Sequence, residues 1–248
     1  MRSREIIQVH TQRGKILRYI QNDMRLIFRD PILYIMLFVP LIFIALLRMG
    51  LPALIGIFPA VEPYSRLLLG TFCLVTAVFP AFIYSFIMLD EKDQDVVTAI
   101  RVLPISSLEF ILIRLMFITA FSYISINILI ATTGILNWPA GKLLIASIPI
   151  SLTAPVMTLF IVGFAHNKIE GATWMKGLNF ILFLPVLSYF VQGPYEYILG
   201  IIPVYWIFKM FDPGFSVVPF RFNYLIALVY YFLILLAGIR IYRHRVFP

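Results

Sequence analysis

The sequence predicts an all-α polytopic membrane protein with six transmembrane helices and both termini in the cytoplasm. Of its 248 residues, 61% are hydrophobic and 13% are charged, whereas soluble domains have about 45–50% apolar and about 25% charged residues. The apolar residues gather in six runs with few or no charges, at residues 31–47, 67–89, 115–136, 143–165, 177–191 and 222–239. Most of these runs are long enough, at about 1.5 Å per residue, to cross an apolar layer about 30 Å thick.

The positions of the basic residues predict the orientation. With six spans, 15 of the 20 Lys and Arg residues fall on the side of the two termini and 5 fall on the other side. Because cytoplasmic segments are enriched in Lys and Arg, the termini are predicted to be cytoplasmic. The net charge of +8 therefore indicates membrane topology and contact with anionic lipid, not binding of nucleic acid. We expect a multi-pass protein of the bacterial cell membrane.

Residues 1–30 are predicted to form an amphipathic helix in the headgroup layer, ahead of a membrane domain at 31–248 in one continuous domain. On a helical wheel, apolar residues form one stripe and three arginines lie opposite it. The stripe is Ile16, Leu17, Ile20, Met24, Ile27 and Phe28, and the arginines are Arg18, Arg25 and Arg29. An ordinary solvated helix start is the alternative. No cleavable signal peptide is expected, because the first apolar run lacks a small-residue cleavage site.

The connections on the external side are predicted to be short. Residues 48–66 read as a loop rich in Pro and Gly, and NWPAGK at 137–142 reads as a tight turn. The fourth run contains Pro149 and Pro155, and prolines bend membrane helices because they remove backbone hydrogen bonds.

The last third of the chain is irregular. The fifth run has only about 15 residues and contains Pro185, and a shorter apolar piece follows at 198–208 with Pro203 inside it. About 11 residues are too few to cross a membrane, and counting the piece as a crossing would place the basic C-terminus outside. We predict a re-entrant element on the external side between the fifth and sixth helices. A simple external interfacial helix is the alternative.

Motifs for catalysis or metal binding do not occur in the sequence. There is no G-x-x-x-x-G-K-[ST], H-E-x-x-H, C-x-x-C or G-x-S-x-G, and the three histidines, His10, His166 and His244, are far apart. Charges near the spans stand at their ends, where long side chains are expected to reach the membrane surface; these are Arg48, Arg66, Arg114, Lys142, Lys176 and Arg240. The sequence therefore predicts no catalytic residue, no metal site and no cofactor held by this chain.

The charged stretch DEKDQDVVTAIRVLPIS at 90–106 is predicted to be a short cytoplasmic helix between the second and third spans. Acidic residues 90, 91, 93 and 95 would begin the helix, where its dipole favours negative charge. Val96, Ile100 and Leu103 follow at helical spacing. Pro104 would end the helix, and Ser106 with Glu109 would cap the third span.

A second cytoplasmic connection, at 165–177, follows the same pattern. Asn167 is a candidate N-cap residue and Glu170 stands three residues later. We predict that the two connections lie beside each other and form a docking surface for a cytoplasmic partner. A pair of ordinary solvated turns is the alternative.

The pattern E-K-D-x-x-V-x-x-A-I-R-V-x-P-I-S at 91–106 resembles the signature of type-2 ABC transporter permeases. In that family an acidic segment leads through a short helix to a Thr-Pro-Leu/Ile-Ser turn. NKIEGATWMKGLNFILFLP, at 167–185, resembles the segment with which the family enters its fifth span. This chain has Asp95 and Val96 where many members have Gly-Thr, and Leu103 where they have Thr. The resemblance covers nearly the whole chain and is nearest to permeases for drug or fluoroquinolone export.

The resemblance implies the membrane-spanning permease subunit of an ATP-binding cassette exporter for an amphipathic small molecule, drug or lipid-like substrate. A separate cytoplasmic ABC ATPase subunit would bind ATP and Mg²⁺, so this chain would not itself be an enzyme. A second permease copy, or a related permease, would complete a dimer in contact with membrane lipid. The residues implied to couple the permease to the ATPase are Glu91, Lys92, Asp93, Ile100, Pro104, Asn167 and Glu170.

Two other functions are compatible with an apolar chain of this kind. A membrane-embedded enzyme of lipid metabolism would need ionisable or nucleophilic groups converging near one interface, and the sequence offers no such set. A non-transporting scaffold or immunity protein would need no partner ATPase. Co-purification with a stoichiometric ATPase would separate an exporter subunit from both.

Overall fold

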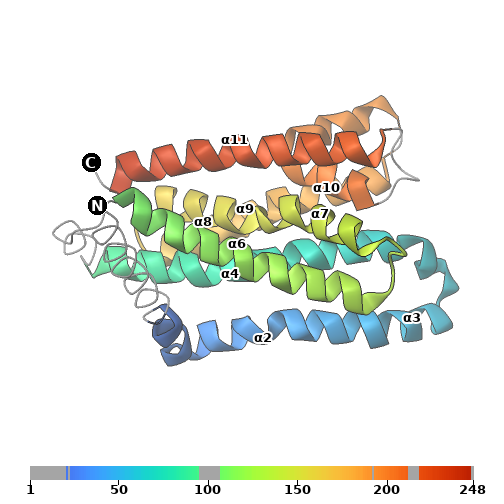
Figure 1. Cartoon of the computed structure of the whole chain (residues 1–248), viewed down its shortest axis with the longest axis horizontal. Helices are drawn as coiled ribbons and strands as arrows, with labels where there is room; N and C mark the ends of the chain where they lie inside the picture. The colour runs from blue at the N-terminus through green and yellow to red at the C-terminus, as the bar shows by residue number, and fades with distance from the viewer. Residues whose placement is uncertain (1–20, 22, 95–106, 192, 212–217, 247–248) are drawn as a thin grey trace, which may run out of the picture.

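The computed structural model of the chain describes residues 21, 23–94, 107–191, 193–211 and 218–246, and every regular element within them is helical. The long helices run side by side along the long axis of the molecule (Figure 1). Among the described residues, five helices are long and apolar enough to cross a membrane; they are Pro31–Ile57, Pro59–Asp93, Leu108–Thr133, Ala140–Phe164 and Phe220–Arg245. The predicted all-α membrane fold is confirmed at this level.

The first membrane helix is longer than the sequence suggested. It comprises α2 (Pro31–Ala45), the π-helical segment η1 (Leu46–Gly50) and α3 (Leu51–Ile57), and the 3-10 helix η2 (Pro59–Tyr64) follows. The prediction of a loop at 48–66 was therefore wrong. The segment LPALIGI is apolar and follows η1 with helical backbone angles at Gly50 and Leu51, so the helix continues although Pro52 has no N–H to donate to the preceding turn.

The start of α2 is fixed by Asp30. Its carboxylate accepts hydrogen bonds from the backbone N–H groups of Ile32 and Leu33, which satisfies donors that have no partner inside the helix. Few residues of α2 are buried within the described chain, so most of its apolar surface faces outward. An apolar outward face is what a helix in contact with lipid requires.

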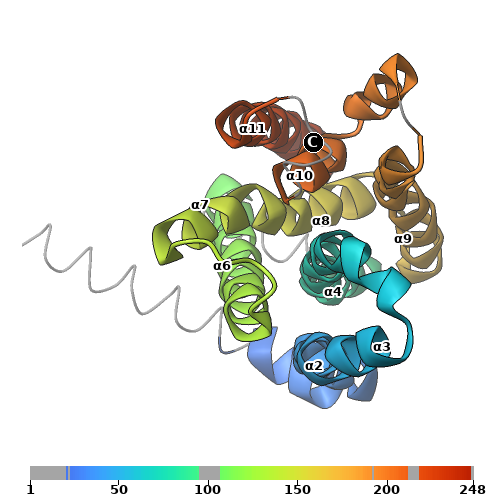
Figure 2. The same ribbon diagram turned by 90° about the vertical axis from the view of Figure 1, so that its right-hand side faces the viewer.

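Helix α4 (Ser65–Asp93) lies at the centre of the bundle. It contacts α2, α6 (Ser107–Thr133), α8 (Thr153–Phe164) and α9 (Lys168–Phe183), and Figure 2 shows these helices arranged around it. Gly70 allows the helix Pro203–Phe211 to approach α4 closely as well: a Cβ on Gly70 would stand 3.2 Å from the ring of Phe208. The predicted second span at 67–89 is extended by a turn beyond its last apolar residue.

The fourth span is bent, as its prolines predicted. Helix α7 (Ala140–Ser151) has Leu152 as its C-cap, and α8 begins at Thr153. Pro155 has no N–H to donate to the carbonyl of Ser151; separately, the Ser151 hydroxyl donates to the Ile148 carbonyl at 2.7 Å. The loss of this backbone bond explains the bend.

The last third is built from short pieces. After α9 come the 3-10 helices η3 (Leu184–Tyr189) and η4 (Pro194–Ile201), then α10 (Pro203–Phe211) and the long helix α11 (Phe220–Val246). The apolar piece at 198–208 is thus divided at Ile202 between two elements. Helix α10 is buried against α11, α4 and α7. Its Lys209 forms an ion pair with Glu196 of η4, with 2.8 Å between Nζ and Oε2.

The two ends of the bundle have different contents (Figure 1). At one end, here called the terminal end, lie the helical residues 23–29, the end of α4, the start of α6, the turn between α8 and α9, and the end of α11. At the other, the opposite end, lie α3, η2, the α6–α7 connection and the elements η3, η4 and α10. Charged residues of the predicted coupling segments stand at the terminal end.

Candidate functional site

The last turn of α4 carries four consecutive charged residues, at 90–93. The prediction that these acids begin a new helix was wrong, because α4 continues through them to Asp93. Negative charge at a helix C-terminus is unfavourable. Here it is compensated by cations from other elements, as the following contacts show.

Arg114 of α6 binds two carboxylates at once. Its Nη2 lies 2.8 Å from Asp23 Oδ1 and 2.6 Å from Glu91 Oε1, and its guanidinium carbon lies 4.4 Å from the centre of the Phe110 ring. The side chains of Arg114, Asp23 and Glu91 are only 4%, 5% and 13% exposed. The prediction that Arg114 reaches the membrane surface was therefore wrong. We call Asp23, Glu91 and Arg114 the buried ion cluster.

The buried ion cluster joins three segments that are far apart in the sequence. Asp23 precedes the first membrane helix, Glu91 lies in the last turn of α4 and Arg114 lies in the second turn of α6. Burial raises the pKa of the Asp23 carboxyl above its ordinary value, and the adjacent Arg114 guanidinium opposes that rise. Sequence reasoning missed Asp23, and its position beside basic and apolar residues gave no signal of a partner 91 residues away.

The turn between α8 and α9 is bonded to the end of α4. Lys168 Nζ lies 2.7 Å from Asp90 Oδ1, and Lys92 Nζ donates to the Ala165 carbonyl at 2.9 Å. Gly171, in the first turn of α9, is buried against Leu89: a Cβ at position 171 would overlap Leu89 Cδ1. The two predicted cytoplasmic connections are therefore side by side where the structure describes them.

Local hydrogen bonds fix the start of α9. The Asn167 side chain accepts from the Glu170 N–H at 2.9 Å, which confirms Asn167 as the N-cap. The Glu170 carboxylate accepts from the backbone N–H of His166 at 2.8 Å and lies 2.9 Å from His166 Nδ1. These bonds lower the pKa of Glu170 below its ordinary value.

The predicted coupling residues that the structure describes fall into three groups. Glu91 faces inward in the buried ion cluster, while Asp93, Asn167 and Glu170 are exposed at the terminal end and Lys92 is half-buried between α4 and the α8–α9 turn. Ile100 and Pro104 lie outside the described residues, as does the part of the predicted short helix at 95–106. Beside Asn167, the apolar side chain of Ile169 is 81% exposed.

A cleft of about 460 Å³ also opens at the terminal end. It lies between residues 26–33, the end of α4 and Lys168, and both apolar and charged side chains line it. The lining includes Leu26, Arg29, Asp30, Phe86, Asp90 and Lys168. Among the residues that the structure describes, no three His, Cys, Asp or Glu side chains are grouped as metal ligands would be. The contacts described at the terminal end are ion pairs, hydrogen bonds and apolar packing.

Comparison with known proteins identifies the family of this chain. The family model described as "Fluoroquinolones export permease protein Rv2686c-like" matches residues 23–239. The chain belongs to this family of export permeases. The match begins at Asp23 and includes the remainder of the buried ion cluster and the α8–α9 turn. The resemblance drawn from residues 91–106 and 167–185 is thereby confirmed, and the protein is a multi-pass transporter of the cell membrane.

Two curated relatives support the assignment. The permease is 30% identical over 210 residues to the Fluoroquinolones export permease protein Rv2686c of Mycobacterium tuberculosis strain ATCC 25618 / H37Rv. The same figures hold for Fluoroquinolones export permease protein MT2760 of strain CDC 1551 / Oshkosh. The aligned region covers 77% of this chain and 79% of each relative, so the likeness extends over most of the membrane domain.

Proposed function

We propose that this permease is the membrane subunit of an ATP-binding cassette exporter. It moves an amphipathic drug or lipid-like molecule, with fluoroquinolone-like compounds as the first class to test because the relatives are named for them. A separate ATPase subunit binds ATP and Mg²⁺ and hydrolyses the ATP. The observation that carries the proposal is the bonded contact between the α8–α9 turn and the last turn of α4.

The contact gives an ATPase a way to move several spans together. Ile169, Asn167 and Glu170 present an apolar side chain and two polar ones at the terminal end. Force applied to this turn reaches α4 through Gly171 and Leu89, which are in direct packing contact. From α4 it reaches α6 and residues 23–29 through the buried ion cluster. Packed elements transmit motion as rigid bodies because their cores resist compression.

In this proposal the terminal end is cytoplasmic and the chain crosses the membrane six times. The fifth crossing is the later part of α9 with η3, from 177 to 189, and the η4–α10 pair is the re-entrant element at the external end. The path of the chain between the two ends of the bundle supports this topology (Figure 1). The apolar outward faces of α2 and α11 are available to lipid and to a second permease in a dimer.

The proposed ATPase contact is tested with two exposed isoleucines. Ile169 at the terminal end is 81% exposed, and Ile57 at the opposite end is 70% exposed. Ile169→Asp is expected to lower ATP hydrolysis by the reconstituted permease–ATPase complex about tenfold or more, because a charge replaces an apolar anchor. Ile57→Asp is the matched control, and Ile100→Asp tests the coupling pattern at 91–106.

Stoichiometric co-purification of the ATPase with the wild-type permease is measured first. If the permease purifies without any ATPase and does not export, the scaffold and enzyme alternatives replace the exporter proposal. If it exports without any ATPase, the proposal of an ATP-driven exporter is wrong. If Ile169→Asp and Ile100→Asp both support wild-type ATP hydrolysis and export, the cytoplasmic docking assignment is wrong.

A further inference from the structure

A groove of about 420 Å³ runs along the outside of the bundle, between α6 and α11. Its floor is the bent fourth span, because α7 and α8 lie between α6 and α11 and pack against both (Figure 2). Most of the lining is apolar, and Met116 on the α6 side is 70% exposed. We call it the lateral groove; residues from 112–123, 148–155 and 235–239 line it.

The hydroxyl groups that line the lateral groove already donate to carbonyl groups of the protein. Thr119 and Ser151 each donate at 2.7 Å to a carbonyl about one turn earlier in the same helix. Tyr123 donates at 3.2 Å to the Leu144 carbonyl of α7. A hydrocarbon chain fits such a wall, whereas a ligand with several polar groups would leave its own donors and acceptors without partners.

The length and depth of the groove correspond to one leaflet of a membrane. On α6 it extends from Leu112 to Tyr123, which is about 16 Å at about 1.5 Å per residue. An apolar layer about 30 Å thick has leaflets of about 15 Å. The membrane helix is Leu108–Thr133, so this stretch lies in its half nearest the terminal end. Leu235 and Ile239 likewise lie in the terminal half of α11.

A basic residue stands where the groove reaches the terminal end. Leu235, Ile239 and Arg243 recur every four residues, so they follow one face of α11. Arg243 lies one turn beyond the last lining residue, and its side chain is exposed. Glu109, the acidic residue in the first turn of α6, already has a partner within the protein. A guanidinium at the membrane surface attracts the phosphate of an anionic lipid.

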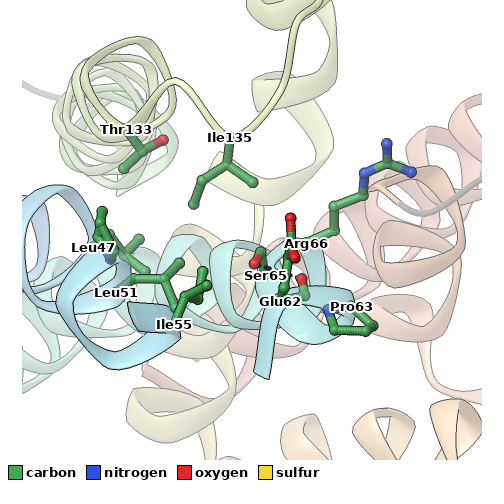
Figure 3. Close-up of a pocket in the computed structure, with 10 residues that line it drawn as sticks. Leu47, Leu51, Ile55, Glu62, Pro63, Ser65, Arg66, Thr133 and Ile135 are labelled. Atoms are coloured by element: carbon green, nitrogen blue, oxygen red, sulfur yellow. Dashed lines mark hydrogen bonds between the residues drawn. The ribbon is translucent and has the colours of Figure 1, made fainter. Parts of the chain in front are cut away.

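A larger hollow at the opposite end of the bundle, of about 670 Å³, does not offer the same combination. It lies between the end of the first membrane helix, the start of α4 and the α6–α7 connection (Figure 3). Arg66 is part of its lining, but the guanidinium points away from the hollow (Figure 3) and already has a partner within the protein. A lipid phosphate would therefore meet no available cation among the residues that line this hollow.

We propose that the lateral groove holds one acyl chain of an anionic phospholipid from the leaflet at the terminal end. The chain lies along α6 from Tyr123 toward Leu112, against the bend of the fourth span, and the phosphate lies at Arg243. A lipid bound in this way contacts α6, the bend and α11 together. The binding does not depend on an ATPase and is independent of the proposed function.

The test measures lipid binding to the purified, delipidated permease by native mass spectrometry. The probes are dioleoyl phosphatidylglycerol, which is anionic, and dioleoyl phosphatidylcholine, which has the same chains and no net charge. Ala120→Trp fills the groove from an exposed position, and Ala131→Trp, at an exposed alanine of the same helix outside the lining, is its control. Arg243→Gln removes the charge, and Arg221→Gln, at the other end of α11, is its control.

The wild type is expected to bind phosphatidylglycerol about fivefold more tightly than phosphatidylcholine, as one basic residue at a membrane surface predicts. Arg243→Gln should remove that preference and leave phosphatidylcholine binding unchanged. Ala120→Trp should weaken the binding of both lipids about tenfold or more, because the chain loses several buried CH₂ groups. Both controls should bind like the wild type, and thermal unfolding checks that every variant is folded.

The proposal is overturned if folded Ala120→Trp protein binds phosphatidylglycerol as tightly as Ala131→Trp does. It is also overturned if Arg243→Gln prefers phosphatidylglycerol as strongly as Arg221→Gln does. If the wild type binds neither lipid and Ala120→Trp dissociates a permease dimer, the groove is a protein interface and the lipid proposal is wrong. Because no ATPase is present, failure of the exporter proposal would leave these measurements intact.

Discussion

Replacing Arg114 by methionine is expected to destabilise the permease by about 3–5 kcal/mol. Removing one partner of a buried ion pair has that cost because the remaining charge stays buried without compensation. Here two carboxylates would be left together, Asp23 and Glu91, each at least 87% shielded from solvent in the wild type. Protonation of one carboxylate limits the loss, so the lower part of the range applies in acid and the upper part near neutral pH.

The free energy of unfolding in detergent, from denaturant titration of purified protein, measures this cost. Arg25→Met, at an exposed position in the same helical segment as the buried Asp23, is the control and is expected to change stability by no more than about 0.5 kcal/mol. The triple variant D23L/E91M/R114M replaces all three charges by apolar side chains and is expected to recover most of the loss, because replacing a buried ionic group by apolar residues of similar volume is often neutral. A value for Arg114→Met equal to that of Arg25→Met would refute the burial argument.

Three further outcomes are expected. Gly171→Ala should lower the free energy of unfolding by about 1–3 kcal/mol by overpacking against Leu89, and by less when Leu89 is also replaced by Ala. Equal losses in the wild-type and Leu89→Ala backgrounds would contradict the contact. The pKa of Glu170 is lowered from its ordinary value of 4.5, so the stability that its carboxylate gives to the start of α9 should be present above about pH 4.5 and lost as the pH falls through the lowered value. Hydrogen exchange of the backbone N–H groups in the first turn of α9 should show this loss, and Glu170→Gln should abolish the pH dependence. Lys209→Met should destabilise the permease by about 3 kcal/mol, because it leaves the Glu196 carboxylate without its cation, and K209M/E196Q should recover that stability. Thermal unfolding of Lys209→Met at the wild-type temperature would contradict the role of the pair.

Local signals in the sequence were sufficient for the helices and for one cap. The six apolar runs each fall on described helical segments, because burial in lipid requires continuous apolar sequence with internal backbone hydrogen bonds. Asn167 and Glu170 were predictable because capping links residues three or four positions apart. The end of the first membrane helix was missed because Arg48 and Pro52 look like loop residues. In the structure Arg48 bonds to the Thr132 carbonyl, and Pro52 occupies a first-turn position.

Long-range pairing was not predictable from these patterns. Arg114 looks like a residue that reaches the membrane surface, and its partners are separated from it by 91 and 23 positions. Only the packing of α4 against α6 determines that the guanidinium faces Glu91. The hollow of about 670 Å³ at the opposite end could not be predicted for the same reason, since the residues that line it come from three parts of the chain. The six charges at 90–106 were correctly identified as unusual, and the partners of those at 90–92 required the structure.

The Lys168–Asp90 ion pair and the Gly171–Leu89 packing contact between α9 and α4 differ in strength, and the difference predicts which of them would transmit force in the proposed exporter. Lys168 and Asp90 form a close pair, but their side chains are 39% and 40% exposed, and exposed pairs contribute about 0–1 kcal/mol and are screened by salt. Gly171 and Leu89 are in buried contact with no space for a methyl group, and such packing is insensitive to salt. Coupling through this joint should therefore survive Lys168→Met and high ionic strength, and fail when position 171 is enlarged. A salt titration of ATP hydrolysis by the reconstituted complex that abolished coupling in Lys168→Met, with the ATPase still bound, would show that the ion pair carries the force.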